Sequence, residues 1–301
     1  MIELKNEKIA IPVVLFAGLL WSFGPLVVRH MDEPGLVPWQ YIFARGLTIY
    51  IVLNLYLFFE EGKNFYKNYF RVGISGLIGG CGLGIAMITF IYSITNTSVA
   101  ITLLCLAAMP FFTALLGFLF LKEKISVNVW IAIGIATIGL IIIALGNTEK
   151  ASLLGLIFGM TSSIGFSVFS VTLRWRKETP KFTTVAIAGL FCVLVSAIFI
   201  IFNGSSFLST SYNGSLFSLH GTIVCMGLIL YSIGSKAIPA AELTLLSLTE
   251  VIGGIFWVWL PLFGVNEIPS TNTIIGGFFL FMSIIYYSLT IKTNRRFIAL
   301  N

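Results

Sequence analysis

The sequence predicts an all-α, polytopic membrane protein with ten transmembrane helices, arranged as two inverted five-helix repeats. Three observations lead to this prediction: the apolar composition, the spacing of the apolar segments, and a block of sequence that occurs twice. Of the 301 residues, 57% are hydrophobic and 10% are charged, with a mean hydropathy of +0.99. A soluble domain carries about 25% charged residues. A core does not need so much apolar sequence, and much of it must therefore face lipid.

The apolar segments have the length of membrane spans. A helix needs about 20 residues to cross the hydrocarbon core of a bilayer. Ten segments of this kind follow one another, separated by short connectors rich in turn-forming residues. They cover residues 9–28, 38–58, 72–92, 98–121, 126–146, 151–172, 183–202, 216–233, 239–260 and 270–291. The first is too long for the apolar part of an ordinary signal peptide, so we expect it to be a retained span.

The basic residues are distributed unevenly between the two sides of this arrangement. Fifteen of the 18 Lys and Arg residues fall in connectors on the side of the N-terminus. Arg29 and Lys150 fall on the other side, and Arg45 lies within a span. Because cytoplasmic connectors are enriched in Lys and Arg, we expect a multi-pass protein of the inner (cell) membrane with both termini in the cytoplasm. The same bias explains the net charge of +6 without a nucleic-acid partner.

One block of sequence occurs twice in the same order. The first copy has Tyr92-Ser93-Ile94, Thr102-Leu103-Leu104-Cys105-Leu106 and Glu123-Lys124-Ile125-Ser126-Val127-Asn128. The second has Tyr231-Ser232-Ile233, Thr244-Leu245-Leu246-Ser247-Leu248 and Glu267-Ile268-Pro269-Ser270-Thr271-Asn272. We therefore predict two repeats, residues 1–147 and 148–301, with five spans each. An odd number of spans inverts the second repeat in the membrane, a plan that recurs in secondary transporters with a substrate site near the midplane.

Small and capping residues add local expectations. Glycines at every fourth position of Gly76–Gly84 predict a face that a neighbouring helix approaches closely. Ser126 and Ser270 are predicted N-caps of the fifth and tenth spans. Glu123 and Glu267, just before them, are expected to be interfacial structural residues.

With these features together, the chain resembles the drug/metabolite transporter superfamily, and within it the EamA-type transporters. The resemblance covers nearly the whole length and rests on Leu19-Leu20-Trp21-Ser22, Phe43-Ala44-Arg45, Leu116-Gly117-Phe118-Leu119-Phe120-Leu121-Lys122-Glu123 and Leu246-Ser247-Leu248-Thr249-Glu250-Val251. Val251 departs from the family, which often has proline after this acid. The resemblance implies a secondary transporter, often an exporter of amino acids or other small metabolites, with a central cavity between the halves.

Glu250 is the leading candidate for a binding or coupling residue. It lies eleven residues beyond Pro239, about 16 Å along a continuous helix. That depth is close to the middle of a hydrocarbon core about 30 Å thick. Burial there favours the neutral acid, which suits a group that exchanges a proton or binds a substrate ammonium. The alternative is a neutral carboxylic acid that bonds to a neighbouring helix.

Arg45 and Glu242 are the next candidates among the charged residues. Arg45 lies some seven residues into the second span, where its guanidinium could bind a substrate carboxylate in bidentate fashion or hold backbone carbonyls. Glu242 lies one turn into the ninth span and is expected near the cytoplasmic entrance, where Lys236 could form an ion pair with it.

Uncharged side chains complete the candidate set. Trp21, Tyr92 and Tyr231 could line the cavity and offer aromatic faces to a cation, or could simply pack. A polar stripe on the sixth span, Thr161, Ser163, Ser167 and Ser170, could face water or bond its own helix. His30 and His220 are expected at the outer interface, without a metal-binding spacing. The four cysteines fall singly in apolar spans and are expected to pack.

The sequence contains no Walker loop, no His-Glu-x-x-His and no Gly-x-Ser-x-Gly, which argues against an enzyme or an ATP-driven pump. We predict a secondary active transporter of a small metabolite, such as an amino acid, that works by efflux and alternating access without cofactor or metal. Its expected partners are this solute, the lipid bilayer and protons as coupling ions, and a homodimer is left open. The alternatives are an importer or exchanger of organic cations or anions, and a non-transporting membrane sensor with the same fold.

Overall fold

The computed structural model describes residues 6–33, 35, 37–146, 152–176, 178–265 and 267–298, with the side chains of 144 and 291–298 excepted. Among these residues, nine helical spans of at least 18 residues, counted across any break within them, are apolar enough to cross a membrane, and Val127–Ile143 forms a shorter apolar helix. Each of the ten coincides with one predicted segment to within a few residues. The prediction of an all-helical, polytopic membrane protein is therefore confirmed.

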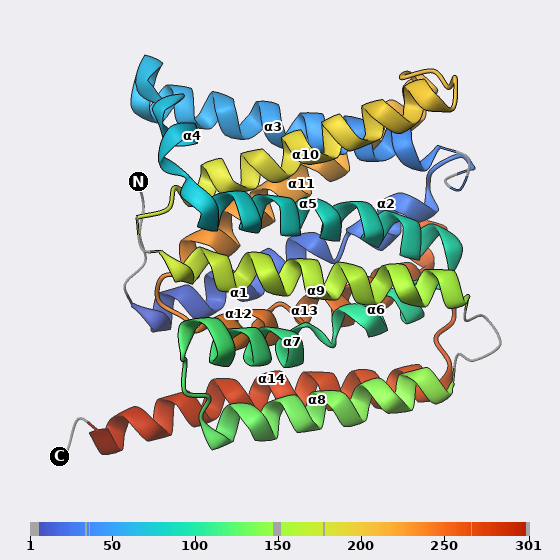
Figure 1. Cartoon of the computed structure of the whole chain (residues 1–301). Coiled ribbons are helices and arrows are strands. Elements are labelled where there is room, and N and C mark those ends of the chain that lie inside the picture. Colours follow the sequence, from blue (N-terminus) through green and yellow to red (C-terminus); the bar gives the residue numbers. More distant parts are fainter. Residues whose placement is uncertain are drawn as a thin grey trace.

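The first half of the chain runs up and down between two ends of the molecule (Figure 1). Its elements are α1 (Glu7–Trp21), α2 (Gly24–Arg29), α3 (Pro38–Glu61), the 3-10 turn η1 (Gly62–Asn64), α4 (Lys67–Arg71), α5 (Gly73–Asn96), α6 (Val99–Leu106), α7 (Met109–Leu116), the π-helical turn η2 (Gly117–Leu121) and α8 (Val127–Leu145).

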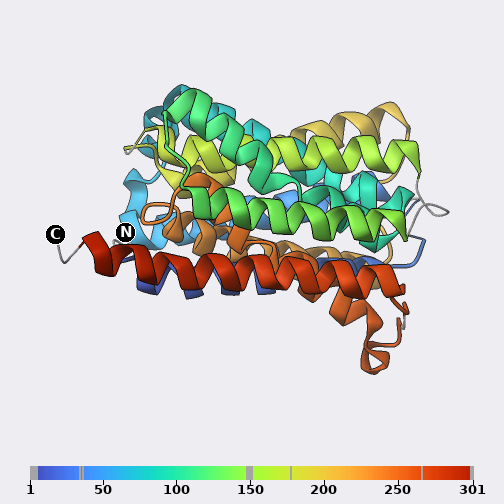
Figure 2. The same cartoon turned by 90° about the horizontal axis from the view of Figure 1, so that it is seen from below.

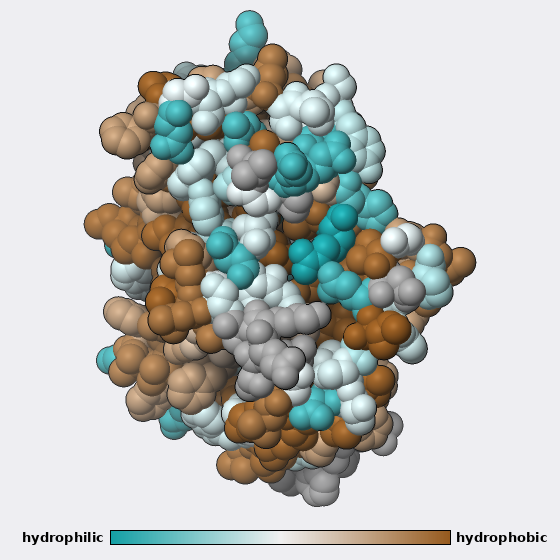
Figure 3. Space-filling view, turned by 90° about the vertical axis from the view of Figure 1, so that its right-hand side faces the viewer, coloured by the Kyte–Doolittle hydropathy of each residue, from teal (hydrophilic) through white to brown (hydrophobic). Residues whose placement is uncertain are grey.

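The second half continues in the same manner. Its elements are α9 (Leu153–Trp175), α10 (Lys181–Phe202), α11 (Ser211–Gly234), α12 (Ala240–Leu246), α13 (Thr249–Trp259), the 3-10 turn η4 (Pro261–Phe263) and α14 (Thr271–Ile298). The start of α1 and the end of α14 lie at the same end of the molecule, the left of Figure 1, which we call the terminal end. The opposite end, which we call the distal end, faces the viewer in Figure 3, where hydrophilic residues gather over its middle.

Close helix pairs hold the bundle together. The most extensive contacts join α5 to α9, α3 to α10, α8 to α14, and α1 to α11. Figures 1 and 2 show α8 and α14 lying side by side along one edge of the bundle. At Gly84 of α5, an added Cβ would lie 2.5 Å from the Phe191 ring of α10, and at Gly80 it would lie 2.6 Å from Ile187. The predicted close approach along this glycine face is confirmed.

Three of the predicted spans are broken rather than continuous. The first divides into α1 and α2, the fourth into α6 and α7, and the ninth into α12 and α13. The last two breaks both fall in the duplicated block, after Leu106 and after Leu246, and the second lies two residues earlier in its copy than the first. The predicted boundary between the repeats, at residues 147 and 148, lies outside the described residues, and the repeat arrangement remains a prediction.

Apolar side chains cover much of the outer surface of the bundle. Large residues with more than four-fifths of their area exposed occur on or beside several helices: Phe59, Phe70, Phe202, Leu208 and Leu262. Such exposure costs free energy in water but not in lipid, since the hydrocarbon core is as apolar as these side chains. The surface is therefore that of a protein surrounded by a bilayer.

Candidate functional site

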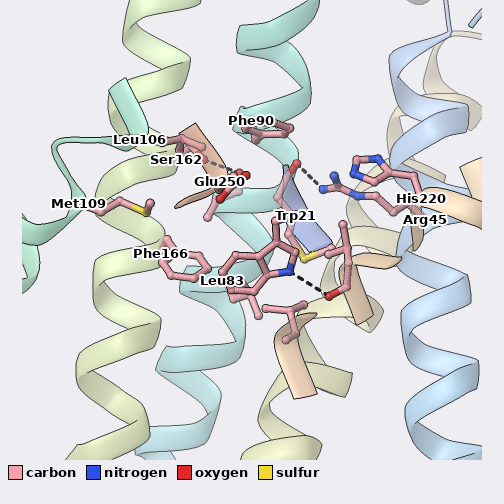
Figure 4. Close-up of a pocket in the computed structure, with 14 residues that line it drawn as sticks. Trp21, Arg45, Leu83, Phe90, Leu106, Met109, Ser162, Phe166, His220 and Glu250 are labelled. Carbon is pink, nitrogen blue, oxygen red and sulfur yellow. Dashed lines mark hydrogen bonds between the residues drawn. The ribbon is translucent and has the colours of Figure 1, made fainter. Parts of the chain in front are cut away.

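The three helix breaks converge on one cavity near the middle of the bundle (Figure 4). Trp21 is the last residue of α1, Leu106 and Met109 flank the break between α6 and α7, and Glu250 is the second residue of α13; all four line this cavity. The other lining side chains come from α3, α5, α9 and α11: Arg45, Leu83, Ala86, Met87, Phe90, Ser162, Phe166, His220, Val224 and Leu228. Broken helices that meet at mid-bundle are a recurrent way of building transporter sites. We call this space the central cavity.

Serine side chains donate to backbone carbonyls at all three breaks. Ser22 Oγ donates to Leu19 O at 2.6 Å, and Ser247 Oγ donates to Thr244 O at 2.8 Å. At the remaining break, Ser167 Oγ of α9 donates to Met109 O at 3.2 Å. In lipid an unsatisfied backbone group costs several kcal/mol, so non-helical backbone persists only where such partners exist. These hydroxyls explain how the chain tolerates interrupted helices at this depth.

Glu250 lies in the first turn of α13, with its side chain only partly buried because it borders the central cavity. The sequence-based estimate of its depth assumed a continuous helix, and this assumption is wrong because the chain breaks three residues earlier, at Ser247. The break places the carboxyl group beside the N-terminal end of α13, where the helix dipole favours a negative charge. No hydrogen bond or ion pair engages this carboxyl within the described part of the chain, which leaves it available to a solute or a proton.

Arg45, on α3, lines the same cavity although only 3% of it is exposed. Its Nη2 donates to Met87 O at 2.8 Å, and the guanidinium carbon lies 5.7 Å from the centre of the Tyr41 ring. Its Nε has no hydrogen-bond partner among the described residues. One guanidinium nitrogen of Arg45 therefore bonds to a backbone carbonyl, and another, beside the cavity, has no partner. An unsatisfied buried donor costs free energy unless a ligand or water accepts its hydrogen bond.

His220 is a cavity residue that the sequence-based prediction missed. It was expected at the outer interface, but α11 begins at Ser211, so His220 lies nine residues along the helix and is 1% exposed. It hydrogen-bonds to the Tyr41 hydroxyl through Nδ1 and lines the central cavity. His30, in contrast, only contacts Leu26 O at 2.8 Å near the distal end.

The three aromatic candidates have different positions. Trp21 lines the cavity, donates from Nε1 to Val224 O at 3.2 Å, and packs edge-on against Phe166 at a centroid distance of 5.5 Å. Tyr231 is fully buried behind Trp21, at 5.4 Å, and does not line the cavity. Tyr92 lies away from it, between Trp39 and Phe158.

Two further expectations concern Glu242 and the polar stripe of α9. Glu242 lies in the first turn of α12, outside the central cavity, and accepts a hydrogen bond from the Tyr287 hydroxyl. Burial lowers the pKa of Lys236, its expected partner, which precedes α12. Of the two alternatives for the polar stripe of α9, bonding within the helix is seen for Thr161, Ser167 and Ser170, which donate to the carbonyls four residues earlier. Ser163, Ser167 and Ser170 are fully buried. Ser162, outside this stripe, is the serine of α9 that lines the cavity, and it donates to Ala86 O at 2.9 Å.

Comparison with known proteins identifies the family to which this architecture is related. Residues 8–145 match the model of the EamA-like transporter family. This part of the chain is an EamA-like domain. The resemblance drawn from the sequence motifs is therefore confirmed, and it extends over the helices α1 to α8.

Two relatives from Helicobacter pylori are each described as an uncharacterized transporter. The one from strain J99 is 28% identical over 207 residues, which is 66% of this chain and 66% of the relative. The one from strain 26695 is 25% identical over 263 residues, covering 82% and 84% of the two chains. A solved crystal structure of a protein shares the fold with a TM-score of 0.70 at 18% identity, covering 96% of this chain and 99% of the other. Together these similarities support a membrane transporter in general terms.

Proposed function

We propose that this protein is a secondary active transporter that exports a small amphipathic metabolite, such as an amino acid, by alternating access. The observation that carries the proposal is the position of Glu250, a carboxyl group without a protein partner in the described structure, where three broken helices meet. An intramembrane acid facing a cavity marks a substrate or proton pathway more often than a structural contact.

The lining of the central cavity favours a solute with one cationic group and an apolar body. Glu250 would bind the ammonium group, and Trp21 and Phe166 would pack against the apolar part. The unsatisfied Nε of Arg45 would receive a carboxylate, which an amino acid also carries. Protonation of Glu250 would release the ammonium, so proton binding and solute binding would exclude one another at this carboxyl.

The size of the central cavity suits a small solute in a transporter whose walls move. Its volume is about 70 Å³. By the same measure one water needs roughly 10–15 Å³, so the cavity holds several waters, and movement of its walls would admit a larger solute. The breaks in α1–α2, α6–α7 and α12–α13 provide hinges for that movement, because backbone dihedral angles can change there without melting a helix.

The proposed repeat and orientation also fit this mechanism. If the two halves are exchanged span for span, the pair α5–α9 becomes α11–α1, and α10–α5 becomes α3–α11; all four pairs are in contact. The pairs α3–α10 and α8–α14 map onto themselves. This exchange supports inverted repeats 1–147 and 148–301. The excess of Lys and Arg in the connectors of the terminal end supports an orientation in which this end faces the cytoplasm and the protein lies in the inner membrane.

Solute flux in proteoliposomes tests the proposal. Purified protein would be reconstituted and assayed with radiolabelled amino acids, amines, organic acids and sugar phosphates, with and without a pH gradient. We expect uptake or release of an amino acid or amine that responds to the gradient. Glu250→Gln should reduce this flux at least about 100-fold, since one charged contact at a desolvated site contributes several kcal/mol.

Glu242→Gln is the matched control, because it removes an acid from the adjacent helix segment outside the cavity. It should retain most of the flux. A transported solute whose flux is the same in Glu250→Gln and the wild type at every pH would refute the role of Glu250. Binding of a solute without net movement would instead favour the sensor alternative, and export direction would be refuted if cells lacking the protein accumulate less solute.

A further inference from the structure

Two Arg–Glu ion pairs lie at opposite ends of the bundle. Arg29 Nε and Glu267 Oε1 are 2.5 Å apart at the distal end, and Arg174 Nε and Glu123 Oε1 are 2.6 Å apart at the terminal end. In each pair the arginine ends the first span of a proposed repeat, and the glutamate belongs to the duplicated block. The two pairs therefore occupy corresponding places in the two proposed repeats, which are inverted relative to one another.

The terminal pair is bonded to a further segment, the connector between α11 and α12. Arg174 Nη1 donates to Ser235 O at 3.0 Å and to Ile238 O at 2.7 Å. Glu123 Oε2 accepts from the backbone N–H of Ala240 at 3.3 Å. Lys181 Nζ also donates to Ser235 Oγ at 2.5 Å. The pair thus ties α9 and the α7–α8 connector to the start of the broken helix α12–α13.

The distal pair has no such bonds within the described part of the chain. The segment that corresponds to the α11–α12 connector is the turn between α5 and α6, which we take together with the adjoining helix ends as residues 95–100. A polar cavity of about 500 Å³ lies between this segment and the Arg29–Glu267 pair and is lined by both. We call it the distal cavity. Its wall includes Ile255, five residues or roughly 7.5 Å along α13 from Glu250, so it lies on the distal side of the central cavity.

From this difference we infer that the two ion pairs are the two ends of one reciprocal latch. In the present structure the terminal latch is closed and the distal latch is open. When the protein turns to face the other side, Arg29 and Glu267 bond to the backbone of residues 95–100 and close the distal cavity, while Arg174 and Glu123 release Ser235, Ile238 and Ala240. The inference rests on the alternating access proposed above, and it names the contacts that make the two states exclusive.

The physical basis is the exchange of equivalent bonds. Each latch consists of charge-assisted hydrogen bonds from a guanidinium to carbonyls and from a backbone N–H to a carboxylate, which are stronger than neutral ones. Because both ends have the same donor and acceptor set, closing one end offsets most of the cost of opening the other. The two states can then remain within a few kcal/mol of one another, as a transport cycle requires.

Thiol labelling at the two ends tests the latch without any knowledge of the solute. Cys81, Cys105, Cys192 and Cys225 would first be replaced by alanine or serine. Single cysteines would then be placed at Asn96, which lines the distal cavity, or at Ala237, in the α11–α12 connector. Protein in nanodiscs exposes both faces to a hydrophilic maleimide, whose reaction rate reports on the opening of each end.

Glu123→Gln should open the terminal latch. We expect labelling at Asn96→Cys to fall and labelling at Ala237→Cys to rise, each about 5-fold or more, since coupling free energies of this kind span roughly 5- to 150-fold. Glu267→Gln should leave labelling at Asn96→Cys unchanged or raise it. The control Glu178→Gln removes an exposed acid near the terminal end and should change neither rate.

Opposite changes at the two ends separate the latch from simple damage, because partial unfolding raises both rates together. If Glu123→Gln raises both rates or changes neither, the latch inference is overturned. Flux measured with the same variants separates this result from a failure of the proposed function. Opposite labelling changes in a protein that moves no solute would retain the latch and refute transport; solute flux with unchanged labelling would retain transport and refute the latch.

Discussion

The broken helices α6–α7 and α12–α13 share a sequence block but differ in the side chains they bring to the central cavity. Thr102 to Leu106 and Thr244 to Leu248 match at four of five positions. The first helix ends at the last residue of its block, and the second ends two residues before the end of its block. The first break presents Leu106 and Met109, which are apolar, whereas the second presents Glu250. The break therefore follows from the duplicated sequence, whereas the charge at the cavity is present at only one of the two breaks.

The neighbouring spans support the two breaks in equivalent ways. Gly18 of α1 faces Thr249 at the start of α13, and Gly159 of α9 faces Cys105 in α6. Both glycines bring a helix backbone against the helix that breaks. If this comparison is right, substitutions at matched positions should destabilise both breaks. The size of each loss should depend on which atoms an added Cβ would contact.

Gly159→Ala should have the largest effect on stability. An added Cβ would lie 2.7 Å from Cys105 Cβ, which is fixed to the backbone, so the helices α6 and α9 would have to move apart. We expect a loss of about 2–3 kcal/mol in the free energy of unfolding, at the upper end of what overpacking costs. Unfolding of the purified protein in mixed detergent micelles measures it.

The control for this substitution is Gly134→Ala on α8, where an added Cβ meets no atom within 4 Å. It should be neutral or stabilising by about 0.5–1 kcal/mol, because alanine favours the helix. If Gly159→Ala were as stable as this control, α6 and α9 would not be in the close contact described here.

Gly18→Ala should destabilise less than Gly159→Ala. The added Cβ would lie 2.1 Å from Thr249 Oγ1, the end of a side chain that can rotate away. Rotation sacrifices the bonds of this hydroxyl to Leu15 O and Leu246 O, at 3.2 and 3.1 Å. We expect a loss of about 1–2 kcal/mol, the sum of modest overpacking and weakened hydrogen bonds. The same unfolding assay would contradict the comparison if Gly18→Ala proved the more damaging of the two.

The positions of the spans could be predicted from the sequence, but the breaks within them could not. Hydropathy is averaged over a whole span, and the run from Val99 to Leu121 is apolar across its interruption. Ser22 and Ser247 donate to carbonyls three residues earlier, but serine hydroxyls also make this bond within continuous helices, so the pattern does not mark a break. Ser167 donates to Met109 O from another helix, and no local pattern reveals such pairing. Pro25 and Pro110, each at a helix start just after a break, are the signals that could have been used.

The candidate site shows the same limit. Glu250 and Arg45 were found because a charge within an apolar span is conspicuous, and both line the central cavity. His220 was missed because the predicted start of its span, residue 216, was five residues beyond the true start at Ser211. Glu123 and Glu267 were recognised as equivalent, but their arginine partners lie 51 and 238 residues away in the sequence. Residues so far apart in the sequence come into contact only through the tertiary fold.

Ser247→Ala should have a smaller effect than either glycine substitution. Ser247 is fully buried, and its hydroxyl donates to Thr244 O at the second break. Removing the donor leaves that carbonyl less well satisfied, at a cost of about 1 kcal/mol. The loss of this bond also lets the backbone at the break change its geometry, which alters the position of Glu250. We therefore expect a lower solute affinity in a protein that is still folded. A thermal shift equal to that of Gly18→Ala, or a variant identical to wild type in both respects, would show that this hydroxyl does not hold the break.

Cys105→Ser should have the smallest effect, because it gives the first break the residue that the second break has. Cys105 is 3% exposed, and its Sγ contacts Leu156 O at a distance of 3.9 Å. A serine hydroxyl at this position can donate to the carbonyl three residues earlier, as Ser247 does, which offsets the cost of burying a polar group. We expect the unfolding free energy to stay within about 0.5 kcal/mol of the wild type. A loss greater than about 1 kcal/mol would mean that the hydroxyl finds no acceptor, as expected for an unpaired buried group. The two breaks would then share sequence but not local geometry, and the comparison between them would fail at its starting point.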